Sequence, residues 1–169
     1  MKISCPSIVL TSVSLLLTIS SCATPSSQSQ GGTPDDFLST KECLDCELSG
    51  QDFSGQSFVN ARLNRSNLSQ SDWTDSDLSQ SLMDSVNLSQ ATLENTNLEG
   101  VALTQANLES ANFTGANLKG AYLRGAQLDQ TIFINADLSG ANLTETNLKV
   151  ANLEGANLEG ATLPEDFTP

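Results

Sequence analysis

Residues 151–160 read ANLEGANLEG, a five-residue unit that occurs twice in succession. The same register extends towards the N-terminus: from Leu48 to Leu163, every fifth residue is Leu, Phe, Trp or Met, which gives 24 units without an insertion. Two residues before each of these central apolar residues the side chain is usually small, and the residue between them is mostly Asn or Asp. A polar residue follows the centre, and often a glycine after it. The chain is therefore a tandem repeat with a period of five.

A period of five fits neither an α-helix nor a long β-strand. On a helix, five residues advance by about 500°, so the apolar centres would spiral around every side. On a strand, five residues put successive centres on opposite faces. The conflict disappears if the chain turns a corner after every five residues, because the small residue and the centre then point inward in each short segment. Four such segments predict a square coil, in an all-β solenoid.

Sorting the residues at intervals of twenty supports four segments per coil. Four of the five aromatic centres fall into one column, and another column contains only leucine: these columns are Phe53, Trp73, Leu93, Phe113, Phe133 and Leu153, and Leu48, Leu68, Leu88, Leu108, Leu128 and Leu148. An outward column of amides predicts a hydrogen-bonded ladder, formed by Asn67, Asn87, Asn107, Gln127 and Asn147. The repeat then makes about six coils, roughly 29 Å tall at a strand spacing of about 4.8 Å.

Both ends of such a solenoid need caps, because the terminal coils have no neighbour on one side. Pro34 and the acidic residues after it suit the first turn of a helix, and Phe37 and Leu38 are expected to cover the open core. At the other end Pro164 blocks further strand pairing, and Phe167 is expected to fold over the last coil. The predicted boundaries are residues 34–47 for a short N-terminal helical cap, 48–165 for the β-helix and 166–169 for the C-terminal tail.

The first 33 residues precede the repeat and have a different composition. Lys2 is followed by an apolar stretch from Ile8 to Ile19, which is short for a transmembrane helix and typical of a secretory signal peptide. Its end, Ile19-Ser-Ser-Cys22, resembles a bacterial lipobox, so residues 1–22 are expected to be a signal peptide with lipidation at Cys22. Ordinary cleavage after Ala23 is the alternative. Residues 23–33 are rich in Ser, Gln, Gly and Pro and predict a flexible tether.

The repeat units ANLES, ANFTG, ANLKG, ADLSG and ANLEG resemble the A(D/N)LXX consensus of the pentapeptide repeat family. Units before Leu98, such as QDFSG and SDWTD, are looser. The resemblance covers about 120 residues and implies a right-handed quadrilateral β-helix. It implies much less about function. Some members imitate B-form DNA and bind type II topoisomerases, whereas many others, including exported ones in photosynthetic bacteria, have no assigned activity.

Cys43 and Cys46 form a C-x-x-C pair at the start of the repeat. A redox pair or half of a zinc site is one interpretation, but a metal needs two more ligands. The chain has no histidine, and the repeat domain has no second cysteine pair. In the repeat register Cys46 occupies a small inward position and Cys43 a central one, so we expect packing or a structural disulfide in an oxidising compartment. No metal and no cofactor is predicted.

The chain is strongly acidic, with 20 Asp and Glu against 7 Lys and Arg. Such a surface repels nucleic acid, and the carboxylates are spread over outward positions. A catalytic carboxylate pair needs a pocket that shifts a pKa, and a packed prism predicts none. One wall carries a possible interaction strip, formed by Leu82, Ala102 and Tyr122 one coil apart. Exposed apolar strips can mark partner or dimer surfaces, although scattered apolar exposure is normal.

These features predict a non-enzymatic, exported protein of the cell envelope, anchored to a membrane by a lipid and acting as a rigid protein-binding or scaffolding module. A soluble form in the periplasm or the thylakoid lumen is the alternative location. A DNA-mimicking binder of a type II topoisomerase is the alternative function, and it requires residence in the cytosol. The expected partner is a protein, with self-association left open and nucleic acid excluded.

Overall fold

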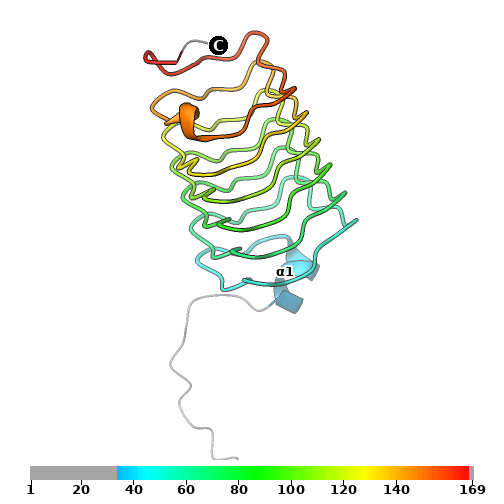
Figure 1. The fold of residues 1–169 in the computed structure, drawn as a ribbon. Helices are drawn as coiled ribbons and strands as arrows, with labels where there is room; N and C mark the ends of the chain where they lie inside the picture. The colour runs from blue at the N-terminus through cyan, green and yellow to red at the C-terminus, as the bar shows by residue number, and fades with distance from the viewer. Residues whose placement is uncertain (1–33, 168–169) are drawn as a thin grey trace, which may run out of the picture.

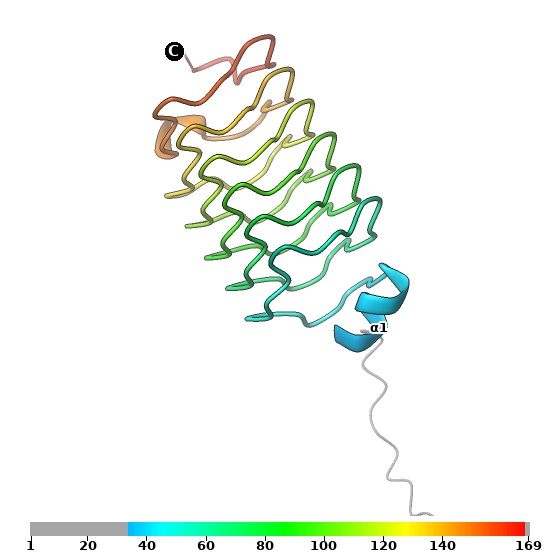
Figure 2. The same cartoon turned by 90° about the vertical axis from the view of Figure 1, so that its right-hand side faces the viewer.

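The computed structural model describes residues 34–167, so the expected signal peptide, the tether and the last two residues lie outside the described part. The described chain winds into a stack of similar coils that rises from α1 at one end to the C-terminus at the other (Figure 1; Figure 2). Residues 34–167 contain two helical elements, α1 (Pro34–Thr40) and the 3-10 helix η1 (Leu148–Val150). Isolated parallel β-bridges take the place of extended strands.

Every bridge joins a residue to the residue 20 positions later, so four five-residue segments make one turn of the solenoid. One wall carries an unbroken series of such bridges from Glu42 to Thr162. Backbone hydrogen bonds connect each coil to its neighbours: the N–H of Leu68 donates to the carbonyl of Asn87 at 2.7 Å, and the N–H of Asn87 donates to the carbonyl of Ser66 at 3.0 Å. The predicted period of twenty is confirmed, and the architecture is a quadrilateral β-helix.

Each corner is a tight turn that places one residue in the left-handed region. The turn is closed by a hydrogen bond to the carbonyl of the central residue, as from the N–H of Ala61 to the carbonyl of Phe58 at 2.9 Å. The residue two after the centre has φ between 53° and 69° at every corner from Asp45 to Gly160 except Val150. A turn of this kind requires positive φ at its third residue, which explains why Gly is the most frequent residue there.

Val150 interrupts the repeat. It is the only β-branched residue among these corner positions, and positive φ is a genuine strain for such a side chain. The chain forms η1 instead of a corner, and Asn147 leaves its bridge position. One coil earlier, the N–H groups of Leu108 and Ser110 donate to carbonyls of the next coil. Within residues 34–167 the corresponding N–H groups of Leu128 and Gln130 consequently have no such acceptor. The repeat register continues through this point without an insertion, but the backbone does not form a regular corner here.

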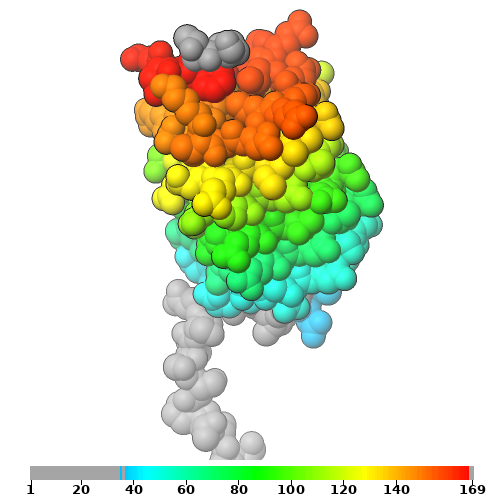
Figure 3. All heavy atoms as spheres, viewed as in Figure 1, coloured from blue at the N-terminus to red at the C-terminus, as the bar shows by residue number. Residues whose placement is uncertain are grey.

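The interior of the solenoid is filled by the small and central residues, as the strand alternation predicts. The predicted stacking in the aromatic column is confirmed, because the rings of Phe53 and Trp73 stack with centroids 4.3 Å apart and those of Phe113 and Phe133 with centroids 5.2 Å apart. Figure 3 shows the outer surface of the described coils as a continuous, closely packed wall. The scaffold that carries any site is thus a filled prism.

The expected amide ladder forms only in part. Asn67 donates to Glu47 at 2.8 Å, and Asn87 donates to Asn67 at 3.2 Å. Higher on this wall the described side chains of Asn107 and Gln127 do not continue the series, and Asn147 has moved into η1. A second ladder, which the column analysis did not single out, runs along a different wall through Asp77, Asn97 and Asn117, at 3.1 and 3.0 Å.

The N-terminal end of the core is covered by one residue of α1. The side chain of Phe37 is fully buried and stacks on Phe58 at a centroid distance of 4.8 Å. Leu38, which was expected to help cover the core, is 45% exposed, so that prediction is wrong. Neighbouring residues of a helix project about 100° apart, so only one of the two faces the coil. At the other end Phe167 is partly buried against the core.

Candidate functional site

The apolar strip predicted from the sequence lies on the outside of one wall. Leu82, Ala102 and Tyr122 occupy the residue before the centre in successive coils, and parallel bridges join each to the next. Leu82 is 42% exposed and Tyr122 is 56% exposed, whereas Ala102 is partly exposed. Because successive bridged residues stand about 4.8 Å apart, the three side chains form one continuous apolar contact surface.

A row of polar side chains lies beside this strip, and hydrogen bonds and an ion pair hold them in place. The side chain of Asp84 accepts a hydrogen bond from Asn64 at 3.2 Å and another from the backbone N–H of Thr104 at 3.2 Å. One coil further on, Arg124 pairs with Glu145 at 2.7 Å. An apolar strip with a polar rim has the composition of a small protein contact site. Leu44, which is 42% exposed on the same wall, was not predicted, although its place after Cys43 in the repeat register is an outward one.

Cys43 and Cys46 are joined by a disulfide at the start of the first coil. The side chains are 3% and 1% exposed, so the sulfur atoms are shielded from solvent. The hydroxyl of Ser66, one coil later, donates to the carbonyl of Cys43 at 2.7 Å and accepts from the N–H of Cys46 at 3.0 Å. Residues 34–167 contain no group of three ligating side chains that could hold a metal ion. The arrangement suits a structural staple.

Three ion pairs lie on the exposed surface of the described coils. Arg65 contacts Asp45 through two hydrogen bonds, at 2.7 and 2.6 Å, and these bonds hold the pKa of the Asp45 carboxyl below its ordinary value. The hydrogen bond from Arg124 lowers the pKa of Glu145 in the same way. Most carboxylates of the described walls have no such basic neighbour, so the surface has a net negative potential.

Two outward aspartates are held in the ionised form by the turn that follows them. Burial pushes the pKa of Asp77 upward, but hydrogen bonds from Ser79 and Asn97 outweigh it, and the pKa lies below its ordinary value. The backbone N–H of Ser139 donates to Asp137 at 2.9 Å and is the main cause of its lowered pKa. Among the described residues every carboxyl with a resolved pKa shift moves downward. These groups suit binding of cations better than donation of a proton near neutral pH.

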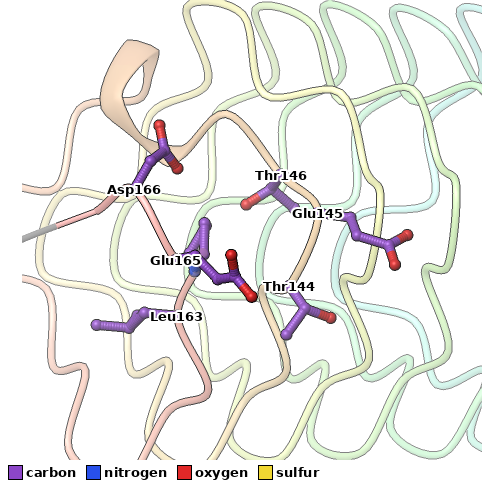
Figure 4. A pocket seen from close by; sticks show the side chains of 7 residues that line it. Thr144, Glu145, Thr146, Leu163, Glu165 and Asp166 are labelled. Atoms are coloured by element: carbon purple, nitrogen blue, oxygen red, sulfur yellow. The ribbon is translucent and has the colours of Figure 1, made fainter.

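The described part contains a surface pocket of about 360 Å³ near the C-terminal end, where the chain leaves the solenoid. The sequence led us to expect no pocket that shifts a carboxylate pKa, and the lowered pKa values of Glu145 and Asp166 at this pocket come from their hydrogen bonds with Arg124 and Lys149. The lining residues are Thr144, Glu145, Thr146, Leu163, Pro164, Glu165 and Asp166. Figure 4 shows that the carboxylates of Glu145 and Asp166 point away from Glu165 and from one another. Glu145 and Asp166 are also engaged by Arg124 and Lys149. The pocket is thus a hollow in which no reactive side chains converge.

The fold and its surface define a class of protein: a repeat solenoid whose coils build continuous outer walls suited to binding. Two family models match the chain, the pentapeptide repeat region at residues 56–133 and pentapeptide repeats, in eight copies, at residues 131–165. The chain belongs to the pentapeptide repeat family, whose solved members are right-handed quadrilateral β-helices. Proteins of this family are generally structural or binding modules. A search of curated proteins found no match.

Several solved structures are similar to this chain. Pentapeptide repeat protein alr5209 from Nostoc Pcc 7120 is 40% identical, with 52% of this chain and 77% of that chain covered and a TM-score of 0.46. Rfr23 from the cyanobacterium Cyanothece 51142 is 30% identical, with 78% and 92% covered and a TM-score of 0.37. QnrB1, a plasmid-mediated fluoroquinolone resistance protein, is 18% identical, with 73% and 83% covered and a TM-score of 0.41. The family assignment rests on the two family models, and these structural similarities carry no argument about a partner.

Proposed function

We propose that this protein is an exported, lipid-anchored scaffold: a β-helix of about six coils, capped by α1, that presents one wall to a protein partner. The observation that carries the binding role is the strip of Leu82, Ala102 and Tyr122, two of whose side chains are large, apolar and exposed. The carboxylates that line the pocket do not converge, so binding accounts for this surface better than catalysis does.

Anchoring is supported by the N-terminal sequence. Ile19-Ser-Ser-Cys22 has the composition of a lipobox, and lipid on Cys22 would hold the domain at a membrane by burying acyl chains. The tether of residues 23–33 spans at most about 40 Å when fully extended, which lets the solenoid stand clear of the lipid headgroups. Residues 34–167 themselves contain no helix that is long and apolar enough to cross a membrane. Location in the cell envelope follows from this proposal.

The intact mass and the N-terminal peptide of the protein from its own host test the location. A diacylated or triacylated Cys22 is the expected result. A chain that begins at Thr24 without lipid would overturn the anchor and leave a soluble protein of the periplasm or the thylakoid lumen. An uncut chain in the cytosol would overturn export as well, and topoisomerase binding would then become the first hypothesis.

A pair of double variants tests the binding wall. Leu82→Lys with Tyr122→Lys adds two charges to the strip, and both positions are exposed, so the variant should remain folded. Thr92→Lys with Asn112→Lys adds the same charge to another wall and is the matched control. We expect the strip variant to lose the protein that co-purifies from the host envelope while the control keeps it. If both retain the same partner, the strip is not the contact surface.

A further inference from the structure

The wall that carries the apolar strip has a distinct set of side chains. The chain contains one tyrosine and three arginines, and all four lie in segments of this wall: Tyr122, Arg62, Arg65 and Arg124. Tyrosine and arginine are enriched in protein interfaces and carry much of their binding energy. On the other described walls acidic residues far outnumber basic ones. This wall is therefore the part of an acidic surface on which a carboxylate of a partner can find a basic group.

Arg62 extends the strip at its N-terminal end. A parallel bridge joins it to Leu82, so it stands one coil below that residue in the same outward column. Its side chain is exposed, and none of the three ion pairs within residues 34–167 includes it. Glu42, its bridge neighbour on the other side, forms no ion pair with it either. The guanidinium of Arg62 can therefore offer a carboxylate two parallel hydrogen bonds.

The spacing of the strip matches a helix better than an extended chain. Leu82 and Tyr122 are two coils apart, which is about 9.6 Å at a strand spacing of about 4.8 Å. Residues i and i+7 of an α-helix lie on one side of it, about 10.5 Å apart. Residues i and i+4 of a strand lie on one face, about 13 Å apart. A helix along the solenoid axis can therefore place three successive apolar side chains over the three residues of the strip.

The backbone of the wall also disfavours an extended ligand. The N–H of Tyr122 donates to the carbonyl of Val101 at 2.9 Å, and the carbonyl of Tyr122 accepts from the N–H of Leu103 at 2.8 Å. The backbone groups of Leu82 and Ala102 are paired in the same way. Extended peptides bind by adding main-chain hydrogen bonds to an open sheet edge, and the strip has no such groups to offer. A helix satisfies its own backbone, so it needs only side-chain contacts.

We propose that the strip binds an amphipathic helix of a protein partner, laid along the solenoid axis, whose apolar residues cover the strip and whose next turn places a carboxylate on Arg62. This inference rests on the binding role of the proposed function and states the kind of partner. The apolar residues are those at i, i+3 or i+4 and i+7 of the helix, the usual anchors of helical ligands. Arg124, at the other end of the strip, is already paired. The carboxylate therefore fixes which end of the helix lies nearest α1.

Charge and size limit the partner further. The net charge of the chain is −13, so a strongly acidic protein is repelled before it reaches the wall. The carboxylate over Arg62 therefore belongs to a helix that is otherwise neutral or basic. Two large apolar side chains and one guanidinium form a contact smaller than the roughly 800 Å² per partner of a standard interface. The contact alone is weak, so a covalent crosslink at the strip captures it most directly.

Photo-crosslinking in the host identifies the bound segment. In the full chain, p-benzoylphenylalanine replaces Ala102 at the middle of the strip. The matched control carries it at Gln127, an exposed residue at the same position of a unit on the neighbouring wall. We expect Ala102 to crosslink to one segment of a host protein in which apolar residues recur with helical spacing beside an Asp or Glu. Gln127 should not crosslink to that segment.

A synthetic peptide of the crosslinked segment tests the role of Arg62 on the purified domain, residues 24–169. The core, the described bridges and the disulfide lie within residues 34–167, so this part forms a self-contained folding unit. Arg62→Glu should weaken peptide binding about tenfold or more in fluorescence anisotropy. Lys119→Glu makes the same change of charge at an exposed position of another wall and should bind within about twofold of wild type. A peptide with its carboxylate residue replaced by Lys should prefer Arg62→Glu to wild type.

The possible results separate this inference from the proposed function. A crosslinked segment with alternating apolar residues, a bound peptide without helical circular dichroism, or equal binding by wild type and Arg62→Glu would overturn the inference and leave a protein contact on the strip. Crosslinks from Ala102 only to lipid, only to a second copy of this chain, or to nothing would overturn both the binding role of the proposed function and the helix. Circular dichroism melts verify that each variant is folded.

Discussion

Replacing Val150 by glycine should repair the break in the last coil. Every other corner residue from Asp45 to Gly160 has positive φ, and Val150 is the only β-branched residue among them. Glycine reaches positive φ at no steric cost, so the Val150→Gly chain can make an ordinary corner. η1 should then disappear, and Asn147 should return to its bridge with Gln127.

The gain can be worked from the hydrogen bonds that the detour removes. A regular coil would return ladder partners to the amides of Leu128, Gln130 and Asn147, at about 0.5–1.5 kcal/mol each. The greater backbone freedom of glycine in the unfolded chain opposes this by about 0.5–1 kcal/mol. The lost packing of Val150 costs little because that side chain is 41% exposed. The net expectation is a stabilisation of about 0.5–4 kcal/mol, or a factor of about 2 to 900 in the folding equilibrium.

Two measurements check this expectation. Denaturant unfolding gives the change in free energy, and amide hydrogen exchange shows whether Leu128 and Gln130 become protected. Val150→Ile is the control, because isoleucine keeps the β-branch for which positive φ is a genuine strain, so we expect it to leave η1 in place. Unchanged exchange at both amides in the glycine variant would refute the reasoning and show that packing around η1, not the sign of φ, holds the chain there.

Three further perturbations test the cap, the staple and the acid response. Phe37→Ala should lower the free energy of unfolding by about 3–5 kcal/mol, as for other buried Phe-to-Ala changes, whereas exposed Leu38→Ala should stay within about 0.5 kcal/mol; equal losses would contradict the assignment of Phe37 as the covering residue. Replacing Cys43 and Cys46 by alanine should destabilise by about 2 kcal/mol in the loop-entropy treatment, measured against wild type under non-reducing conditions. The pKa of Asp137 is lowered from 3.8 in the folded state. The folding stability that its ionised carboxylate contributes is therefore present above that pH and is lost as the pH falls through the folded-state pKa. Asp137→Asn should therefore lose less stability than wild type between pH 5 and pH 2 in acid titrations followed by circular dichroism. Identical acid profiles for the two proteins would count against the Ser139 hydrogen bond as the cause of the lowered pKa.

Much of the architecture was predictable because each position of the five-residue unit has the same environment, inward, outward or at a corner, in every coil. The column sorting correctly placed Phe53 over Trp73 and Phe113 over Phe133, since residues one coil apart must touch in a solenoid. The strip of Leu82 and Tyr122 was predictable for the same reason. The amide ladder was only partly right, because a shared column brings two amides close without fixing the orientation of either side chain.

The sequence by itself determined the period, the number of sides and the inward and outward faces, because these depend on local alternation and on one corner in every five residues. Only the tertiary structure decided how the ends close. Phe37 and Leu38 are equally apolar in sequence, and the direction in which α1 docks selects one of them for the core. The inward residues from Ala151 to Leu163 match the repeat as well as any others, yet they are only partly buried because no further coil packs against them within residues 34–167. A periodic sequence specifies the contacts between neighbouring coils, whereas the fate of a terminal coil depends on what the rest of the chain places against it.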